Sequence, residues 1–298
     1  MNTPFEALCL SGGAIKGILQ LGAISVYEEN GEFDSKNVHF FSGTSIGSAL
    51  ICLIAIGWSA DDIFVRLNSQ DTFFPHGKNF SLSNLKEKLG LISIDVVLSL
   101  LDEMILEKRG KIPTFRELYE EDGKTLYIVA TDTVKQKPIY YSPRTRPNML
   151  ITDAARDSCN IPFVFSQREN NVVDGGLVDN FPINVLDNGK RKILAIYTPW
   201  KSSITNSLSP LSYVSGILAS PINSLCQMQV KFASSAVTIV ECKWEGLSLG
   251  IIPQEMNNDQ KLDMFLAGRK AAEEQRKKKL IYVSNWDEED EWSWGEDV

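Results

Sequence analysis

The sequence predicts a three-layer α/β/α fold with a central, mostly parallel β-sheet covered by helices on both faces. In the first 57 residues, strand-like and helix-like segments alternate, and this β-α-β-α order is typical of parallel strands connected by helices. The strand-like segments are short, continuous apolar runs, as expected for strands buried on both faces. With 298 residues, of which 43% are hydrophobic and 23% charged, the chain can bury a large core.

The first four elements are predicted from apolar periodicity and from glycine positions. A strand is expected over residues 5–10, where an apolar run ends at a pair of glycines, and a helix over 18–29, which Gly31 terminates. A second strand over 38–42 and an apolar helix over 48–57 follow.

Helical, amphipathic sequence dominates residues 61–119, where charges are interleaved with Leu and Ile. Beyond it we expect two strands joined by a short turn, a short helix ended by Asn160 and Pro162, two buried strands and a C-terminal helix. These elements cover residues 126–131, 137–141, 152–159, 172–173, 192–197 and 261–279.

The net charge of −8 comes almost entirely from the C-terminal end. The last twelve residues hold seven acids and no base, whereas the rest of the chain has 31 acids and 30 bases. An acidic chain argues against a nucleic-acid binder, because those proteins usually carry a clustered basic surface. We expect one globular domain over residues 5–285 and a flexible, acidic tail over 286–298.

Cysteine and histidine usage indicates a reducing compartment and no metal site. The five cysteines are scattered without a C-x-x-C pair, and the N-terminus lacks the basic and apolar regions of a signal peptide. The two histidines lie outside any zinc-binding pattern. We therefore expect a cytoplasmic protein without a metal or other cofactor.

Two uncharged segments must be tested as membrane spans. Residues 37–60 contain Gly43, Gly47 and several Ser and Thr, which favour a strand, a sharp turn and a buried helix. A membrane-anchored scaffold is the alternative for this segment. Residues 202–230 contain two prolines and many polar residues, so an amphipathic surface or lid segment is expected, with an ordinary core helix as the alternative.

The pentapeptide Gly43-Thr44-Ser45-Ile46-Gly47 lies where a strand gives way to a helix. A G-x-S-x-G turn in this context exposes the serine hydroxyl, and glycines flank it because side chains would clash there. The N-terminal end of the following helix favours negative charge at Ser45. Ser45 is a candidate nucleophile, and a tight turn with a helix-capping serine is the alternative.

A serine nucleophile needs a base. His39 lies six residues before Ser45 in the same strand, about 20 Å away, which is too far for a hydrogen bond. His76 lies in a predicted loop and is not excluded by distance, but nothing around it suggests an orienting partner. Asp174 ends an apolar strand before two glycines, so its carboxylate would project from the sheet edge; an Asp-Gly turn is the alternative.

A third block, Ser11-Gly12-Gly13-Ala14-Ile15-Lys16-Gly17, also separates a strand from a helix. Clustered backbone amides at a helix N-terminus bind anions. The block lacks the Gly-Lys-Ser/Thr of a phosphate-binding loop and the spacing of a dinucleotide-binding loop. An oxyanion hole facing Ser45 fits the geometry, because both loops would lie at the same end of adjacent strands.

In this order and context, the three blocks resemble the patatin-like phospholipase family. The first resembles its glycine-rich oxyanion motif, residues 43–47 its nucleophile elbow, and residues 174–182 its aspartate motif. Residues 154–158, with Pro162, resemble the helix and proline that precede that motif. The resemblance covers residues 5–200 and, more loosely, the C-terminal helix.

The resemblance implies a catalytic Ser-Asp dyad, with Ser45 as the nucleophile and Asp174 as the base. The amides around Gly12, Gly13 and Ala14 would hold the oxyanion. The family usually has a third glycine where this chain has Ala14, so its methyl group is expected to require a negative φ.

Lys16 occupies the family's basic position, where it would either brace the loop through an ion pair or contact a lipid phosphate. The supporting residues of the three motifs are Gly17, Gly43, Gly47, Gly175 and Gly176. The resemblance implies hydrolysis of fatty acyl esters of phospholipids or related lipids, of the phospholipase A or lysophospholipase type, with peripheral membrane contact. A non-catalytic lipid-binding protein on the same fold is the alternative.

Overall fold

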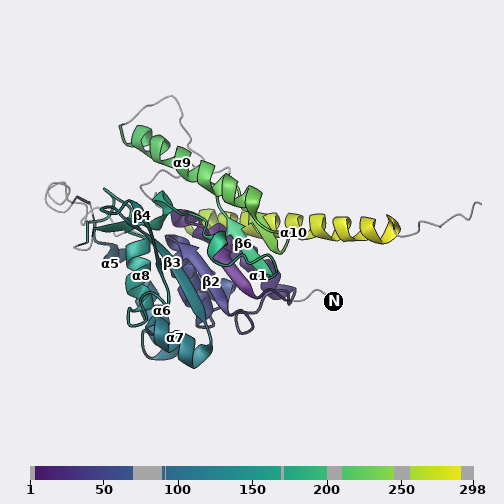
Figure 1. The fold of residues 1–298 in the computed structure, drawn as a ribbon, viewed down its shortest axis with the longest axis horizontal. Coiled ribbons are helices and arrows are strands. Elements are labelled where there is room, and N and C mark those ends of the chain that lie inside the picture. The colour runs from purple at the N-terminus through teal and green to yellow at the C-terminus, as the bar shows by residue number, and fades with distance from the viewer. Residues whose placement is uncertain are drawn as a thin grey trace, which may run out of the picture.

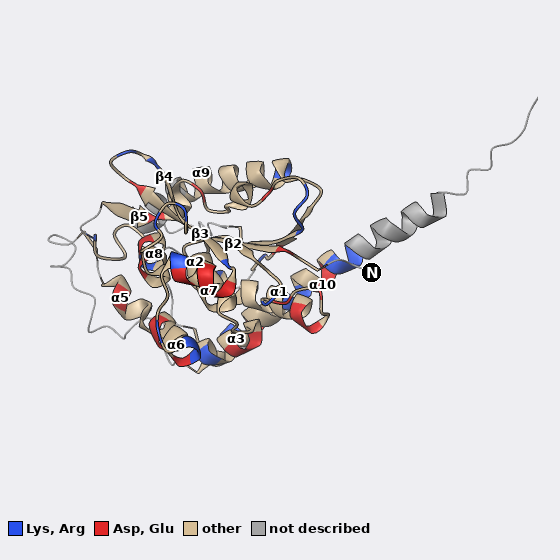
Figure 2. Ribbon diagram, turned by 60° about the horizontal axis from the view of Figure 1, so that its bottom comes forward, with Lys and Arg blue, Asp and Glu red and all other residues tan. Residues whose placement is uncertain are grey.

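The computed structural model describes residues 4–69, 89–90, 92–168, 171–199, 210–244 and 256–289. These residues form three layers, with a central β-sheet between the long helix α9 on one face and most of the other helices on the opposite face (Figures 1 and 2). The predicted α/β/α architecture is therefore confirmed.

The sheet has seven strands, in the order β4-β3-β2-β1-β6-β7, with β5 beside β3. Their bounds are β1 Ala7–Leu10, β2 Phe40–Thr44, β3 Thr125–Asp132, β4 Lys137–Tyr141, β5 Val172–Asp174, β6 Ile193–Tyr197 and β7 Val237–Glu241. Only β4 and β5 run antiparallel to their neighbour. Strand β7 was not predicted, although its β-branched sequence, Val-Thr-Ile-Val-Glu, is typical of a strand.

Strands β2 and β5 meet end to end beside β3, and this arrangement positions the site. Strand β2 runs parallel to β3 and ends where Thr44 pairs with Val129. Strand β5 runs antiparallel to β3 and ends where Asp174 pairs with Ala130, the next residue of β3. The carboxyl ends of β2 and β5 therefore point toward each other.

The helices are α1 Gly17–Glu29, α2 Ile46–Ala55, α3 Ala60–Asn68, α5 Ile94–Val97, α6 Ser99–Arg109, α7 Phe115–Asp122, α8 Ile151–Ser158, α9 Pro210–Phe232 and α10 Asn258–Glu289. Three 3₁₀ turns, η1 Ala14–Lys16, η2 Gly175–Leu177 and η3 Ile183–Val185, lie between them. The predicted helices over 18–29, 48–57 and 152–159 are found within two residues of the expected bounds.

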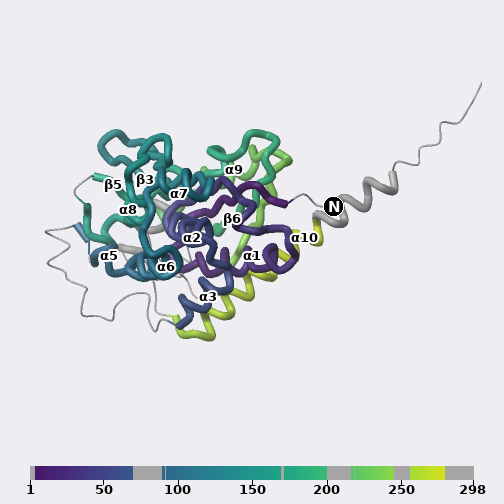
Figure 3. The backbone as a smooth tube through the Cα atoms, turned by 90° about the horizontal axis from the view of Figure 1, so that it is seen from below, coloured from purple at the N-terminus to yellow at the C-terminus, as the bar shows by residue number. Residues whose placement is uncertain are grey.

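The two faces of the sheet contribute to two separate hydrophobic cores. Leu8 and Leu10 of β1 belong to the larger core, which α1, α2 and α10 cover. The alternate residues Ala7 and Cys9 belong to the smaller core, which Phe181 and α9 cover. Helix α10 packs along α1 on the outer side of the larger core (Figure 3).

For residues 202–230 we expected an amphipathic surface or lid segment, with a core helix as the alternative. Residues 202–209 lie outside the described residues, and the rest belongs to helix α9, which buries one side in the smaller core. Helix α9 continues through Pro221, which lies on the exposed side, where water can bind the carbonyl that the missing N–H leaves free. Helix α10 is longer than the predicted 261–279 and continues to Glu289, beyond the domain boundary expected at 285. Within the described part of the chain, no helix is both long enough and apolar enough to cross a bilayer.

Candidate active site

Ser45 occupies a strained turn between β2 and α2. Its backbone has φ 54° and ψ −130°, a conformation that costs an L-residue about 1–3 kcal/mol. The flanking glycines make the turn possible, because a Cβ at Gly47 would lie 2.5 Å from the Leu10 carbonyl oxygen and one at Gly43 would lie 2.7 Å from the Gly47 backbone. The strand–turn–helix context predicted for the G-x-S-x-G block is therefore present.

Two further serines hold the backbone of Ser45, and the sequence analysis assigned them no role. The Ser45 amide donates to Ser158 Oγ (2.8 Å), and that hydroxyl in turn donates to the Val129 carbonyl of β3. On the other side of the peptide, Ser48 Oγ donates to the Ser45 carbonyl (2.6 Å). The Ser158 contacts depend on how α8 packs against the turn and β3, so short sequence motifs do not reveal them, whereas the Ser48 contact is local to the first turn of α2.

The side chains of Ser45 and Asp174 are hydrogen-bonded to each other. Ser45 Oγ donates to Asp174 Oδ2 at 2.6 Å, and the Gly176 amide donates to Asp174 Oδ1 at 2.7 Å. Both residues are almost fully buried, with 6% and 7% of their surface exposed. Burial raises the pKa of Asp174 to about 6, while the hydrogen bonds from Ser45 and Gly176 oppose the rise.

Histidine is absent from the surroundings of Ser45 in the described residues. His39 is exposed and precedes β2, at the end of the strand opposite Ser45. His76 lies outside the described residues. The structure thus brings Ser45 together with Asp174 and not with His39.

The glycine-rich block lies directly against Ser45, because a Cβ at Gly12 would be 3.2 Å from Ser45 Cβ. The Gly12 amide is already used, as it donates to the Asn180 carbonyl (3.0 Å). The amides of Gly13 and Ala14 have no acceptor within the part of the chain that the structure describes. Of the three amides predicted to hold the oxyanion, those of Gly13 and Ala14 therefore remain available as donors, and that of Gly12 does not.

Ala14 has φ +50°, so the expectation of a negative φ at this position is wrong. The turn from β1 into η1 needs a left-handed residue, and the alanine adopts that conformation at a cost of about 1–2 kcal/mol. Lys16, which is 8% exposed, donates from Nζ to the Pro199 carbonyl (2.9 Å) beyond β6. Burial lowers the pKa of Lys16 to about 8.

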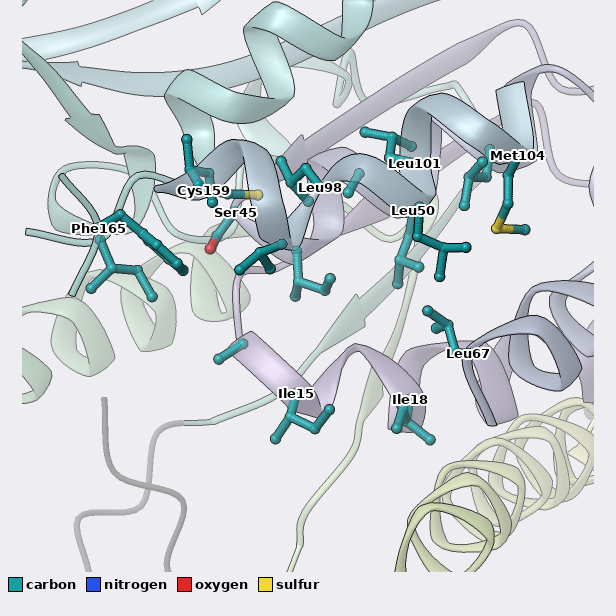
Figure 4. Close-up of a pocket in the computed structure, with 18 residues that line it drawn as sticks. Ile15, Ile18, Ser45, Leu50, Leu67, Leu98, Leu101, Met104, Cys159 and Phe165 are labelled. Atoms are coloured by element: carbon teal, nitrogen blue, oxygen red, sulfur yellow. The ribbon is translucent and has the colours of Figure 1, made fainter. Parts of the chain in front are cut away.

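An apolar cavity of about 130 Å³ opens beside Ser45. Eighteen residues from α1, α2, α5, α6 and neighbouring segments line it, and Ser45 is the one residue among them with a hydroxyl group. Ser45 lies at one end, near Cys159 and Phe165, whereas Leu67 and Met104 lie at the other (Figure 4). An extended apolar group bound here would have its end next to Ser45 Oγ.

The sequence model of the family described as patatin-like phospholipase matches residues 8–187, which is more than half of the chain. The chain belongs to the patatin-like phospholipase family. The three blocks singled out in the sequence all lie within the matched region. For this patatin-like chain, hydrolysis of lipid esters is the general activity that family membership supports.

Relatives from two viruses have similar sequences. The chain is 29% identical over 211 residues to the probable lipid hydrolase 463L of Invertebrate iridescent virus 6, covering 69% of this chain and 71% of that protein. It is 31% identical over 201 residues to the uncharacterized protein R571 of Acanthamoeba polyphaga mimivirus, covering 65% and 66%. The crystal structure of VipD from Legionella pneumophila has a similar fold (TM-score 0.57, 17% identity, 92% of this chain and 67% of that one).

Proposed function

We propose that this patatin-like protein is a lipid acyl hydrolase of the phospholipase A or lysophospholipase type, working through a Ser45–Asp174 dyad. The observation that carries the proposal is the 2.6 Å hydrogen bond from Ser45 Oγ to Asp174, located at the end of an apolar cavity. With a pKa of about 6, Asp174 is mostly ionised at neutral pH and can accept the serine proton.

In the acylation step, Asp174 takes the proton from Ser45 Oγ while Oγ bonds to the ester carbonyl carbon. The carbonyl oxygen becomes an oxyanion, to which the free amides of Gly13 and Ala14 donate. When the tetrahedral intermediate collapses, the carbon–oxygen bond to the alcohol breaks, and Asp174 gives its proton to the leaving oxygen. The alcohol product departs, as a lysophospholipid from a phospholipid or as a glycerophosphodiester from a lysophospholipid, and the acyl group stays on Ser45.

Deacylation repeats the sequence with water as the nucleophile. Asp174 takes a proton from the water, the resulting tetrahedral intermediate uses the same two amides, and Ser45 Oγ leaves with the proton that Asp174 returns. The fatty acid is released.

The cavity supports an acyl chain as the part of the substrate that is recognised. It runs from Ser45 along α2 and is lined by Ala, Val, Ile, Leu, Met, Cys and Phe side chains, which bind methylene groups but offer no partner to a charged headgroup. The headgroup would therefore remain outside, on the side of Ser45 away from the cavity.

The proposal is tested by measuring free fatty acid release from defined phospholipids and lysophospholipids. The wild-type protein should release fatty acid, Ser45→Ala should release none above background, and Asp174→Asn should lose about 10³-fold or more in kcat. Ser69→Ala, at an exposed serine after α3, serves as the matched control and should behave like the wild type. Lipid binding without release by the wild type would instead favour the non-catalytic alternative.

A further inference from the structure

Helix α9 has three distinct sides. Residues such as Ile222 and Cys226 pack into the smaller core, and Gln229 donates to the buried carboxylate of Asp179 (2.7 Å). A second side carries exposed polar residues, Ser220, Ser224, Gln227 and Lys231. The third side is the unusual one, because it is exposed and apolar.

The apolar side consists of five exposed residues, here called the α9 stripe: Ile217, Pro221, Leu225, Met228 and Phe232. Their spacing of four, four, three and four places them within about 80° of the helix circumference, since each residue turns the helix by about 100°. Phe232 is 72% exposed and Met228 is 55% exposed. A contiguous apolar stripe of this kind marks an interaction surface rather than scattered surface residues.

The charge around the α9 stripe is one-sided. Residues 193–240 contain no Asp or Glu, although the chain has 38 of them, and they contain two lysines, Lys201 and Lys231. Figure 2 shows the same contrast, because α9 is nearly free of red while α3, α6 and α7 carry many acids. Among the described residues, four acids from outside this range lie beside it. Asp179 is bound by Tyr140 and Gln229, and Asp187 is bound by Ser234. Glu241 and Glu274 line a cleft with Gln227 and Lys231 on the polar side of α9, where Lys243, Lys270 and Lys278 outnumber them.

A second exposed apolar group lies on the opposite layer, on α3 and α10, and includes Val65, Leu262 and Leu266. The helices that carry it also carry acids in their first turns, Asp61 and Asp62 on α3 and Asp259 on α10. A negatively charged surface would repel this group and not the α9 stripe. The charge pattern therefore distinguishes the two.

We propose that the α9 stripe is the surface by which the protein docks on an anionic phospholipid bilayer. Helix α9 would lie in the plane of the interface, with its apolar side among the acyl chains and Lys231 at the headgroups, as amphipathic interfacial helices do. It packs on η2, the turn that immediately follows Asp174, so the docked helix lies next to the segment that carries the proposed base. This assignment rests on the proposed function, because a phospholipid substrate would itself be a component of the bilayer.

The test is vesicle co-sedimentation in the Ser45→Ala background, so that hydrolysis cannot alter the lipid. Vesicles of phosphatidylcholine and phosphatidylserine in a two-to-one ratio are compared with pure phosphatidylcholine. The parent protein should bind the anionic vesicles more tightly, and Met228→Glu/Phe232→Glu should weaken that binding roughly tenfold or more. Met228→Ser/Phe232→Ser, which adds no charge, should weaken it as well, and Val65→Glu on the opposite layer should not.

Three results would overturn the proposal: no binding by the parent protein, equal binding by the parent and the α9 variants, or an equal loss in Val65→Glu. Light scattering tests the alternative that the α9 stripe binds a second copy of the chain. A dimer in the parent protein that becomes a monomer in the α9 variants would assign the stripe to that contact and also overturn the proposal. Hydrolysis of the soluble ester p-nitrophenyl butyrate, measured with Ser45 restored, should be unchanged in the α9 variants. Failure of the hydrolase proposal would remove that activity without altering vesicle binding.

Discussion

The conformation of Ser45 is maintained by residues far away in the sequence. Ser158, 113 positions from Ser45, accepts a hydrogen bond from the Ser45 amide. In the neighbouring glycine-rich turn, the Gly12 amide donates to the carbonyl of Asn180, which lies 168 positions from Gly12. Ser45 and Asp174 could be picked out from the sequence because glycines mark both positions locally. These supporting contacts could not, because they exist only once α8 and the residue 174–182 loop have packed.

Asp174 is expected to destabilise the fold at neutral pH while serving catalysis. Its pKa is about 6 in the folded protein and about 3.9 in an unfolded chain, so the folded state binds the proton more tightly. Stability from this group is therefore fully present at low pH and is lost as pH rises from about 4 through about 6. Asp174→Asn should have a higher Tm than the wild type at pH 8, with the difference shrinking toward pH 4.

Thermal unfolding over this pH range checks the prediction. Asp132→Asn is the matched control, because hydrogen bonds from the Lys135 amide and from other groups lower the pKa of Asp132. That variant should lose stability at pH 8 or leave it unchanged. A Tm for Asp174→Asn below that of the wild type at pH 8 would contradict the account.

Ser158 is expected to act as a positioning residue. Ser158→Ala removes the acceptor of the Ser45 amide, so the strained turn can relax and kcat should fall about 10–100-fold with KM unchanged. Ser48→Ala should cost less, because the Ser45 carbonyl also accepts from the Ser48 amide (2.8 Å). The measured rates are divided by the concentration of active sites, which is determined by labelling with a fluorophosphonate. If the fall in rate is explained wholly by a lower concentration of active sites, Ser158 serves only folding.

At the scale of elements, α2 connects Ser45 to the cavity, since Ser45 immediately precedes the helix and Ala49, Leu50 and Leu53 line the cavity along its length. Sequence periodicity was sufficient to place this helix. It did not decide between a surface or lid segment and a core helix at α9, because two prolines and many polar residues interrupt the apolar pattern there. It also missed the full length of α10, because the last described turns continue into acidic sequence without a clear stop signal.

Narrowing the cavity should change the chain-length preference. Ala49→Leu adds side-chain volume beside Ser45, so kcat/KM for p-nitrophenyl decanoate should fall about tenfold or more while the value for the acetate stays within about twofold. Leu106→Ala, on the outer side of α6, should leave both values unchanged. Equal losses for the two esters in Ala49→Leu would show that the cavity does not hold the acyl chain.

At the scale of the whole molecule, the sheet topology brings the side chains of Ser45 and Asp174 together. The parallel order of β1, β2 and β6 follows from the alternation of strands and helices, and it places two glycine-rich turns at one edge. The antiparallel approach of β5 to β3 has no local signal in a strand of three residues, yet it is what sets Asp174 opposite Ser45. The residues of the candidate site could therefore be inferred from sequence motifs, whereas their relative positions could be seen only in the folded structure.

The central claim, that Ser45 is the nucleophile of an acyl hydrolase, is tested most directly by fluorophosphonate labelling followed by peptide mass spectrometry. The account predicts one adduct on the peptide containing Ser45, with labelling that increases as pH rises through about 6, where Asp174 loses its proton. An adduct on a different residue, or labelling that persists in Ser45→Ala, would contradict it.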